Sequence, residues 1–246
     1  MNQLNVVITG ANSGIGLATA KRYLAEGHRV FAMSRNIDVL ESLKLTFATQ
    51  LQIVKCDVSK LKDLEEFYQS MLSQNQKIDI LVASAGIANA ESLNSVTEAS
   101  FDKTFDINVK GLFFTVQKAI PVLKNTSAVV LVGSIQAFKG AGTWAVYGAS
   151  KAAVRSLVRS FAAELGPVGI RVNCISPGVT KTPIFEKFGF EKHKLDSILA
   201  HVSATTPLGR LGSPEEIANA IHFLCSKEAS FIHGADLQVD GGLAQI

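Results

Sequence analysis

The chain has 246 residues, of which 47% are hydrophobic and 18% are charged, a composition typical of a packed globular protein that excludes an extensively disordered one. Its 24 basic and 21 acidic side chains leave a formal net charge of +3, too balanced and too scattered to indicate a nucleic-acid-binding face. No apolar run approaches the roughly 20 residues that cross a membrane, and no signal-like segment is present. We therefore expect a cytoplasmic protein that binds neither nucleic acid nor membrane.

Short apolar runs rich in β-branched residues alternate with longer amphipathic segments along the chain. The runs predict strands at 5–9, 29–33, 51–55, 78–83, 128–132, 170–175 and 236–239. They are apolar nearly throughout, which is typical of parallel strands covered on both faces. Repeated strand–helix–strand units predict an α/β fold of the Rossmann type, with a doubly wound, seven-stranded parallel sheet and helices on both faces. We expect one domain over 1–246.

Two helices and one irregular stretch stand out between the strands. Residues 152–165 place their apolar side chains on one face, and 214–225 begin with Ser213 as N-cap and a proline in the first turn. The stretch 181–207 has mixed polarity, with prolines at 183 and 207 and phenylalanines at 185, 188 and 190. We predict a mobile lid over a substrate cleft there, a surface helix and loop being the alternative.

A glycine-rich turn lies between the first strand and the first helix. Glycines at 10, 14 and 16 permit a tight turn, close approach to a diphosphate and close helix–strand packing. The helix N-terminus offers free N–H groups to an anion. A turn with a purely steric purpose is the alternative. We predict that a dinucleotide diphosphate binds here, against Gly10, Asn12, Ser13, Gly14, Ile15 and Gly16.

The end of the second strand indicates which dinucleotide is bound. An acidic residue about 20 residues after the glycine-rich turn would accept a hydrogen bond from the ribose 2′-hydroxyl of NAD. This chain has Ser34 and Arg35 there instead. Arg35 can pair with a 2′-phosphate through charge-assisted hydrogen bonds, although a solvated arginine at a strand end is the alternative. We predict NADP(H) as cofactor, with NAD(H) as the other option.

Tyr147 and Lys151 are four residues apart at the start of the long amphipathic helix predicted around 152–165, which places them on one helical face. Reduction of a carbonyl requires a proton donor for the developing alkoxide. The ordinary pKa of tyrosine is about 10, and a neighbouring ammonium lowers it by favouring the phenolate. We predict an acid/base pair, although helices often carry this spacing by chance.

Two further polar residues are candidates for the same site. Ser134 follows the strand at 128–132, at the edge where open α/β sheets bind ligands, and can hydrogen-bond the substrate oxygen; a turn cap is the alternative. Asn108 interrupts an otherwise apolar helical face, where it needs a partner. We expect it to hold a water or a backbone carbonyl near Lys151, or to tie down a helix kink.

Together these residues resemble the short-chain dehydrogenase/reductase family over essentially the whole chain. The matching motifs are Thr-Gly-x-x-x-Gly-x-Gly at 9–16, Asp57-Val58, Ala85-Gly86, Asn108, Ser134, Tyr147-x-x-x-Lys151 and Ser176-Pro177-Gly178. Two positions depart from the family pattern. Many relatives have Asn-Asn-Ala-Gly where this chain reads Ala83-Ser84-Ala85-Gly86, and many NADP-using members have a basic residue where this chain has Ser13.

The resemblance implies a role for each matching residue. Tyr147 would be the general acid/base, Lys151 would tune it and hold the nicotinamide ribose, Ser134 would position the carbonyl oxygen, and Asn108 would anchor a water chain. Asp57 and Val58 would contact the adenine, and Ala85 and Gly86 would line the cofactor. Pro177, Gly178 and Val179 would line the nicotinamide, and Thr182 would reach its carboxamide or the diphosphate. Hydride would pass without a metal, in a homotetramer formed through helices around 105–124 and 147–165.

The substrate stays open between several classes. The chain looks similar to 3-oxoacyl-[acyl-carrier-protein] reductases, for which Lys124 and Lys139 could serve in part as carrier-protein contacts. A general carbonyl reductase or a sugar/polyol dehydrogenase is the alternative. A non-catalytic NADP-binding sensor or scaffold is a rival of another class. Phe138, Trp144, Phe185 and Phe188 could wall an apolar pocket, or could be core or tetramer contacts. His222 and Cys225 share one predicted helical face, so we expect no metal site.

Overall fold

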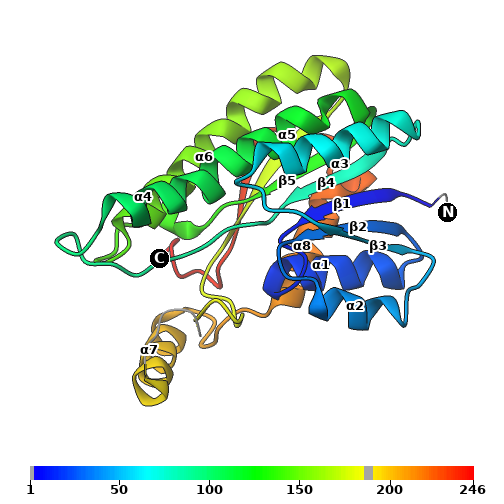
Figure 1. The fold of residues 1–246 in the computed structure, drawn as a ribbon. Helices are drawn as coiled ribbons and strands as arrows, with labels where there is room; N and C mark the ends of the chain where they lie inside the picture. The colour runs from blue at the N-terminus through cyan, green and yellow to red at the C-terminus, as the bar shows by residue number, and fades with distance from the viewer. Residues whose placement is uncertain (1–2, 186–190) are drawn as a thin grey trace.

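The computed structural model describes residues 3–185 and 191–246. Seven parallel strands form one sheet in the order β3-β2-β1-β4-β5-β6-β7 (Figure 1). Their bounds are β1 (Asn5–Thr9), β2 (Arg29–Ser34), β3 (Leu51–Lys55), β4 (Ile78–Ala83), β5 (Leu123–Val132), β6 (Arg171–Pro177) and β7 (Asp236–Val239). The strand order reverses between β1 and β4, which makes the carboxyl ends of these strands the expected ligand-binding edge. The predicted Rossmann-type fold is confirmed.

Helices cover both faces of the sheet. They are α1 (Gly14–Ala25), α2 (Asp38–Lys44), α3 (Leu61–Ser73), α4 (Glu98–Phe105), α5 (Leu112–Ala119), α6 (Ala145–Leu165), α7 (Lys192–Thr205) and α8 (Pro214–Cys225). A π-helical segment, Asp106–Gly111, joins α4 to α5, and 3₁₀ turns lie at Ile120–Val122, Ile135–Ala137, Gly166–Val168 and Lys227–Ala229. Helices α1, α2 and α8 lie on one face and α3, α5 and α6 on the other, while α7 stands away from the sheet (Figure 1). None of these helices is both long and apolar enough to cross a membrane.

Most predicted element boundaries agree with the structure, and the exceptions have a local cause. The strand expected at 128–132 begins earlier, at Leu123. The apolar pattern did not indicate this start because exposed polar residues separate Leu123 from the apolar run. The helix pattern seen at 152–165 belongs to a helix that begins at Ala145. Helix α8 has the predicted bounds, and its capping box pairs Ser213 with Glu216, each side chain accepting from the other residue's backbone N–H.

The alternation of side chains along the strands builds two hydrophobic layers. Val7, Phe31 and Leu81 belong to a core that also includes α3, α5 and α6. Their neighbours Ile8 and Val82 belong to a second core with α1 and α8. All five side chains are fully buried. Burial on both sides fixes the strand register, since a slip of one residue would exchange the two layers, and so holds the loops at the carboxyl edge in fixed positions.

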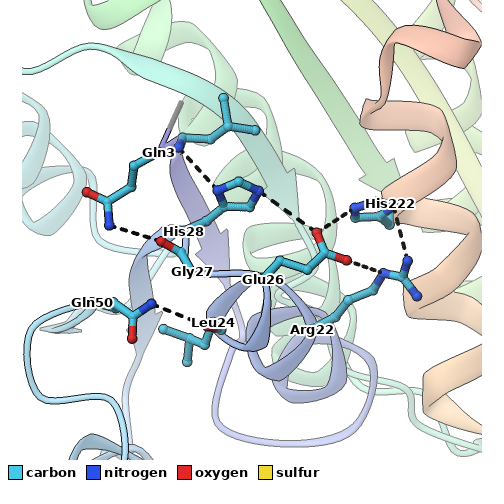
Figure 2. Close-up of polar contacts among 9 residues, drawn as sticks. Gln3, Arg22, Leu24, Glu26, Gly27, His28, Gln50 and His222 are labelled. Atoms are coloured by element: carbon cyan, nitrogen blue, oxygen red, sulfur yellow. Dashed lines mark hydrogen bonds and ion pairs between the residues drawn. The ribbon is translucent and has the colours of Figure 1, made fainter. Parts of the chain in front are cut away.

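A polar cluster joins α1 to α8 on the second layer (Figure 2). His28 and His222 both face the carboxylate of Glu26, with their Nε2 atoms 3.9 and 2.9 Å from Oε2. The Leu4 N–H donates to Nδ1 of His28 over 3.3 Å, so His28 is neutral in this arrangement. Burial is the largest cause that lowers the pKa of His28, against the raising effect of Glu26.

Acidification should therefore destabilise the protein through His28. Because its pKa in the folded state is below the ordinary value, the unfolded chain takes up the proton first. Stability then falls as the pH drops below about 6.5, by at most about 1.4 kcal/mol per pH unit for one proton. His28→Gln should reduce this fall, since glutamine does not titrate. Urea unfolding at neutral and mildly acidic pH measures it, with exposed His193→Gln as control; an equal fall in His28→Gln and wild type would contradict it.

Candidate active site

A cleft of about 810 Å³ lies at the carboxyl edge of the sheet. Its lining includes every residue predicted to bind the cofactor, and three of the four predicted catalytic residues. The predicted residues that line it are Gly10, Asn12, Ser13, Gly14, Ile15, Gly16, Ser34, Arg35, Asp57, Val58, Ala85, Gly86, Ser134, Tyr147, Lys151, Pro177, Gly178, Val179 and Thr182. Asn108 is fully buried behind this lining. The parallel sheet thus brings together residues that are widely separated in the sequence.

The glycine-rich turn lies in the middle of the cleft, at the carboxyl end of β1. Gly10 has a φ of +68°, and a Cβ there would lie 2.8 Å from Cα of Ala85. A Cβ on Gly16 would lie 2.3 Å from the carbonyl oxygen of Gly10. Such distances leave no room for a larger residue. The Thr9 hydroxyl accepts hydrogen bonds from the N–H groups of Ser84 and Ala85, which holds this turn against the loop after β4.

The N-terminus of α1 is open to an anion. In this helix, all of which the structure describes, the Ser13 side chain makes no capping hydrogen bond and the first turn has no acidic residue. Uncapped N–H groups and the helix dipole favour a phosphate at this position. A Cβ on Gly14 would lie 3.1 Å from Cγ2 of Thr182, so the segment after β6 closes over the same turn. The cradle therefore fits a dinucleotide diphosphate.

The ends of β2 and β3 form the far end of the cleft. Ser34 is buried, and Arg35 follows it with an exposed side chain. Asp38, in the first turn of α2, also lines the cleft; the sequence analysis missed this acidic residue because it lies beyond the strand tip. After β3, the Asp57 carboxylate accepts from the N–H and the hydroxyl of Ser59 over 3.1 and 2.7 Å. The side chains that could distinguish the 2′-hydroxyl of an adenosine ribose from a 2′-phosphate therefore lie at this end of the cleft.

Tyr147 and Lys151 occupy consecutive turns of α6, at the end of the cleft opposite to β2 and β3. The Lys151 Nζ lies 5.7 Å from the centroid of the Tyr147 ring and donates to the Val132 carbonyl over 2.8 Å. Lys151 is 5% exposed, and this burial lowers its pKa to about 8. A buried lysine beside a half-buried phenol in a cleft is typical of an acid/base site.

The pKa of Tyr147 differs from the expectation. Burial raises it, and a hydrogen bond with the Ser134 side chain lowers it by less. The predicted lowering by Lys151 is therefore wrong for this arrangement of the chain, because the desolvation of the phenol dominates and the Lys151 ammonium is directed to the Val132 carbonyl. The phenol stays protonated at neutral pH, which is the form that can donate a proton.

Asn108 lies in the π-helical segment between α4 and α5. Its side chain accepts from the Ile87 N–H over 2.8 Å and donates to the Ile87 carbonyl over 2.9 Å. It also donates to the Ser150 hydroxyl on α6 over 3.1 Å. A Cβ on Gly86 would lie 3.3 Å from the Asn108 side-chain oxygen and 3.6 Å from the Lys151 Nζ. Asn108 therefore lies at a helix irregularity close to Lys151. From there it binds the Ile87 backbone carbonyl and positions the loop after β4.

The four aromatic candidates for an apolar wall separate in the structure. Trp144 and Phe185 line the cleft. Phe138 does not; it is 39% exposed and its ring lies under the Arg155 guanidinium. Phe188, like the nearby Phe190, lies outside the described residues. Lining residues that the sequence analysis missed include Ile87, Ala88, Gln136 and Ile184, which lie in loops without a periodic pattern.

Comparisons with known proteins agree with this geometry. A family model described as enoyl-(acyl carrier protein) reductase matches residues 10–244. The oxidoreductase asL5 of Sarocladium schorii is 37% identical over 98% of this chain and 95% of its own length. The 3-oxoacyl-[acyl-carrier-protein] reductase FabG of Thermotoga maritima is 34% identical over 96% of each chain. A solved short-chain dehydrogenase/reductase from Brucella melitensis, described as a glucose/ribitol dehydrogenase, superposes with a TM-score of 0.91 at 34% identity over 100% of both chains.

Proposed function

The chain belongs to the short-chain dehydrogenase/reductase family and is an oxidoreductase, and we propose that it reduces a carbonyl compound to an alcohol with NADPH, and catalyses the reverse reaction with NADP⁺. One observation carries the proposal: a half-buried, protonated Tyr147 lies beside Ser134 and Lys151 in a cleft that also contains the glycine cradle. A site that both holds a dinucleotide and supplies a proton suits this reaction.

The side chains of the cleft divide the work. When bound, the reduced nicotinamide supplies the hydride that adds to the carbonyl carbon. Ser134 donates a hydrogen bond that holds the carbonyl oxygen, and Tyr147 gives its hydroxyl proton to that oxygen as negative charge develops on it. Lys151 binds the nicotinamide ribose with the N–H donors that its hydrogen bond to the Val132 carbonyl leaves over. The proton is then replaced from solvent, along a path that Asn108 helps to position.

Arg35 supports NADP(H) over NAD(H). Its guanidinium is exposed at the mouth of the cleft and, within the described parts of the chain, makes no ion pair, so its donors are available to a 2′-phosphate. Ser34 adds a hydroxyl beside it. Asp38 lines the same end, and its carboxylate works against a phosphate. The preference therefore depends on the balance between Arg35 and Asp38.

Carrier-protein docking has less support than a free carbonyl substrate. Lys124 lies near the amino end of β5, at the edge opposite the cleft, and its ammonium pairs with Asp79 over 2.5 Å. Lys139 donates to the Leu243 carbonyl over 2.6 Å. The ammonium groups of both lysines are thus bonded to other groups of this chain. Neither is directed toward an acidic carrier helix beside the cleft.

Two features of the proposed enzyme concern its larger architecture. The segment after β6 supports a substrate lid over 181–207, since Pro183, Ile184 and Phe185 line the cleft and α7 stands apart from the sheet (Figure 1).

A homotetramer through the helices around 105–124 and 147–165 is supported by apolar side chains exposed near them. Phe101 and Ile120 are 43% and 40% exposed.

A panel of β-keto thioesters, ketones, aldehydes and sugars tests the proposal. We expect the purified protein to oxidise NADPH with at least one carbonyl compound, and to use NADPH with a higher kcat/KM than NADH. Absorbance of the reduced nicotinamide measures both. Tight NADPH binding without turnover on any member of the panel would instead favour a sensor or scaffold. Turnover with NADH alone would contradict the cofactor assignment and leave the oxidoreductase activity in place.

A further inference from the structure

We propose that the substrate is an uncharged, apolar carbonyl compound, such as an aryl or alkyl ketone, and that Trp144 is the residue that selects it. This inference rests on the proposed function and specifies its substrate class. It is drawn from three features of the cleft: the distribution of charge, the nature of the wall beside Tyr147, and the backbone that places Trp144.

Charge in the cleft is confined to the end that is distant from Tyr147. Arg35, Asp38 and Asp57 follow β2 and β3. Among the described lining residues near Tyr147, Lys151 is the one charged side chain, and its ammonium is already bonded to the Val132 carbonyl. The single ammonium at the catalytic end is thus held by Val132 and, in the proposed function, serves the nicotinamide ribose, so no second cation is present there to pair with a substrate carboxylate or phosphate, and burying such an anion unpaired would be costly.

The wall beside the catalytic groups is mostly apolar. Trp144 packs against Tyr147 with ring centroids 5.6 Å apart and an interplanar angle of 65°, the edge-to-face geometry that aromatic pairs favour. Ile87, Ile184 and Phe185 line the same cleft. A sugar or polyol would need a hydrogen-bond partner for each buried hydroxyl; among these side chains and the adjoining Gln136, the indole N–H and one amide are the groups that could supply one, too few for several hydroxyls. An aryl or alkyl group instead gains contact area.

The backbone just before Trp144 is in an unusual conformation. Thr143 has a φ of +64°, in the left-handed region that a β-branched residue rarely adopts. Its carbonyl oxygen accepts a hydrogen bond from the Glu91 N–H over 2.8 Å, which ties it to the loop between β4 and α4. Conformations of this kind persist where the surrounding structure imposes them, and they cluster at ligand-binding sites. Here the constraint fixes the backbone next to Trp144, the N-cap residue of α6.

The test compares three ketones of different polarity, and their different intrinsic reactivities cancel in each variant-to-wild-type ratio of kcat/KM. Acetophenone is apolar, dihydroxyacetone represents sugars, and pyruvate carries a carboxylate. We expect wild-type kcat/KM with NADPH to be highest for acetophenone. Trp144→Ala should lower kcat/KM for acetophenone roughly 10- to 100-fold, mainly through KM, because binding contacts common to the ground and transition states are lost. The value for dihydroxyacetone should fall much less, and Trp144→Phe should retain most of the preference for acetophenone.

Phe138→Ala is the matched control. Phe138 belongs to the same connection between β5 and α6, but its ring lies outside the cleft against Arg155, so its removal should leave the acetophenone-to-dihydroxyacetone ratio unchanged. NADPH affinity and circular dichroism verify the fold of each variant. If Trp144→Ala does not fold, the wild-type ranking and Trp144→Phe decide the matter.

The possible failures are distinct. Wild-type turnover that is highest with dihydroxyacetone or pyruvate would overturn the inference and leave the NADPH-dependent reductase intact. So would an acetophenone preference that survives in Trp144→Ala at its wild-type value. Absence of turnover with every carbonyl compound would instead remove the proposed function itself.

Discussion

Replacing Tyr147 by phenylalanine should lower kcat for NADPH-dependent carbonyl reduction by about 10²- to 10⁴-fold, the usual contribution of a general acid. The substitution removes one hydroxyl from a half-buried ring and keeps the ring that packs against Trp144. The dissociation constant for NADPH should therefore change little, because the glycine cradle and the N-terminus of α1 are unaffected. Stopped assays of NADPH consumption and a fluorescence titration of NADPH measure the two quantities separately.

Tyr68→Phe is a control for this experiment. Tyr68 is a buried tyrosine of α3 whose hydroxyl has no hydrogen-bond partner within the described residues, so the same chemical change is made outside the cleft. It should leave kcat and NADPH affinity at wild-type values. If Tyr147→Phe retained wild-type kcat, Tyr147 would have no part in proton transfer, and the donor would have to be sought among the other hydroxyls of the cleft, Ser134 first.

The fold could be predicted from the sequence because its signals are local. Runs such as 78–83 and 128–132 are apolar on both faces, and a strand of that kind needs helices on both sides of its sheet. The glycine-rich turn could also be predicted, since only glycine fits where a Cβ would lie 2.3 Å from a carbonyl oxygen, as at Gly16. These features depend on neighbouring residues in the chain, so a single sequence contains them.

The remaining features depend on contacts between distant segments. Asp38 belongs to the next helix, and only the direction of α2 brings it to the cleft that Arg35 borders. Phe138 and Trp144 are both aromatic residues after β5, and only their placement separates the exposed ring from the lining one. The direction of the Tyr147 pKa shift likewise follows from burial by surrounding elements. The four-residue spacing indicated that Lys151 is a neighbour of Tyr147, but it contained no information about the desolvation of the Tyr147 phenol.

The cofactor preference yields the other prediction with a large expected effect. Arg35→Asp should lower the ratio of kcat/KM for NADPH to that for NADH by on the order of 10²-fold. A charge-assisted hydrogen bond is worth about 1.5–3 kcal/mol, or roughly one to two factors of ten. The new carboxylate would also repel the 2′-phosphate of NADPH while accepting a hydrogen bond from the 2′-hydroxyl of NADH. Initial rates with each nucleotide at a fixed carbonyl concentration give the ratio.

Further variants separate the local effect from a general change of charge. Lys21→Asp makes the same change in net charge on an exposed position of α1 outside the cleft, and it should leave the ratio unaltered. Asp38→Asn removes the opposing carboxylate and should raise the ratio, because Arg35 then faces the phosphate without a competing negative charge. Added salt should weaken NADPH binding in the wild type more than in Arg35→Asp, since exposed charges are screened. A ratio that stays constant in both Arg35→Asp and Asp38→Asn would mean that neither side chain reaches the 2′ position, and the preference would have to come from the glycine-rich turn.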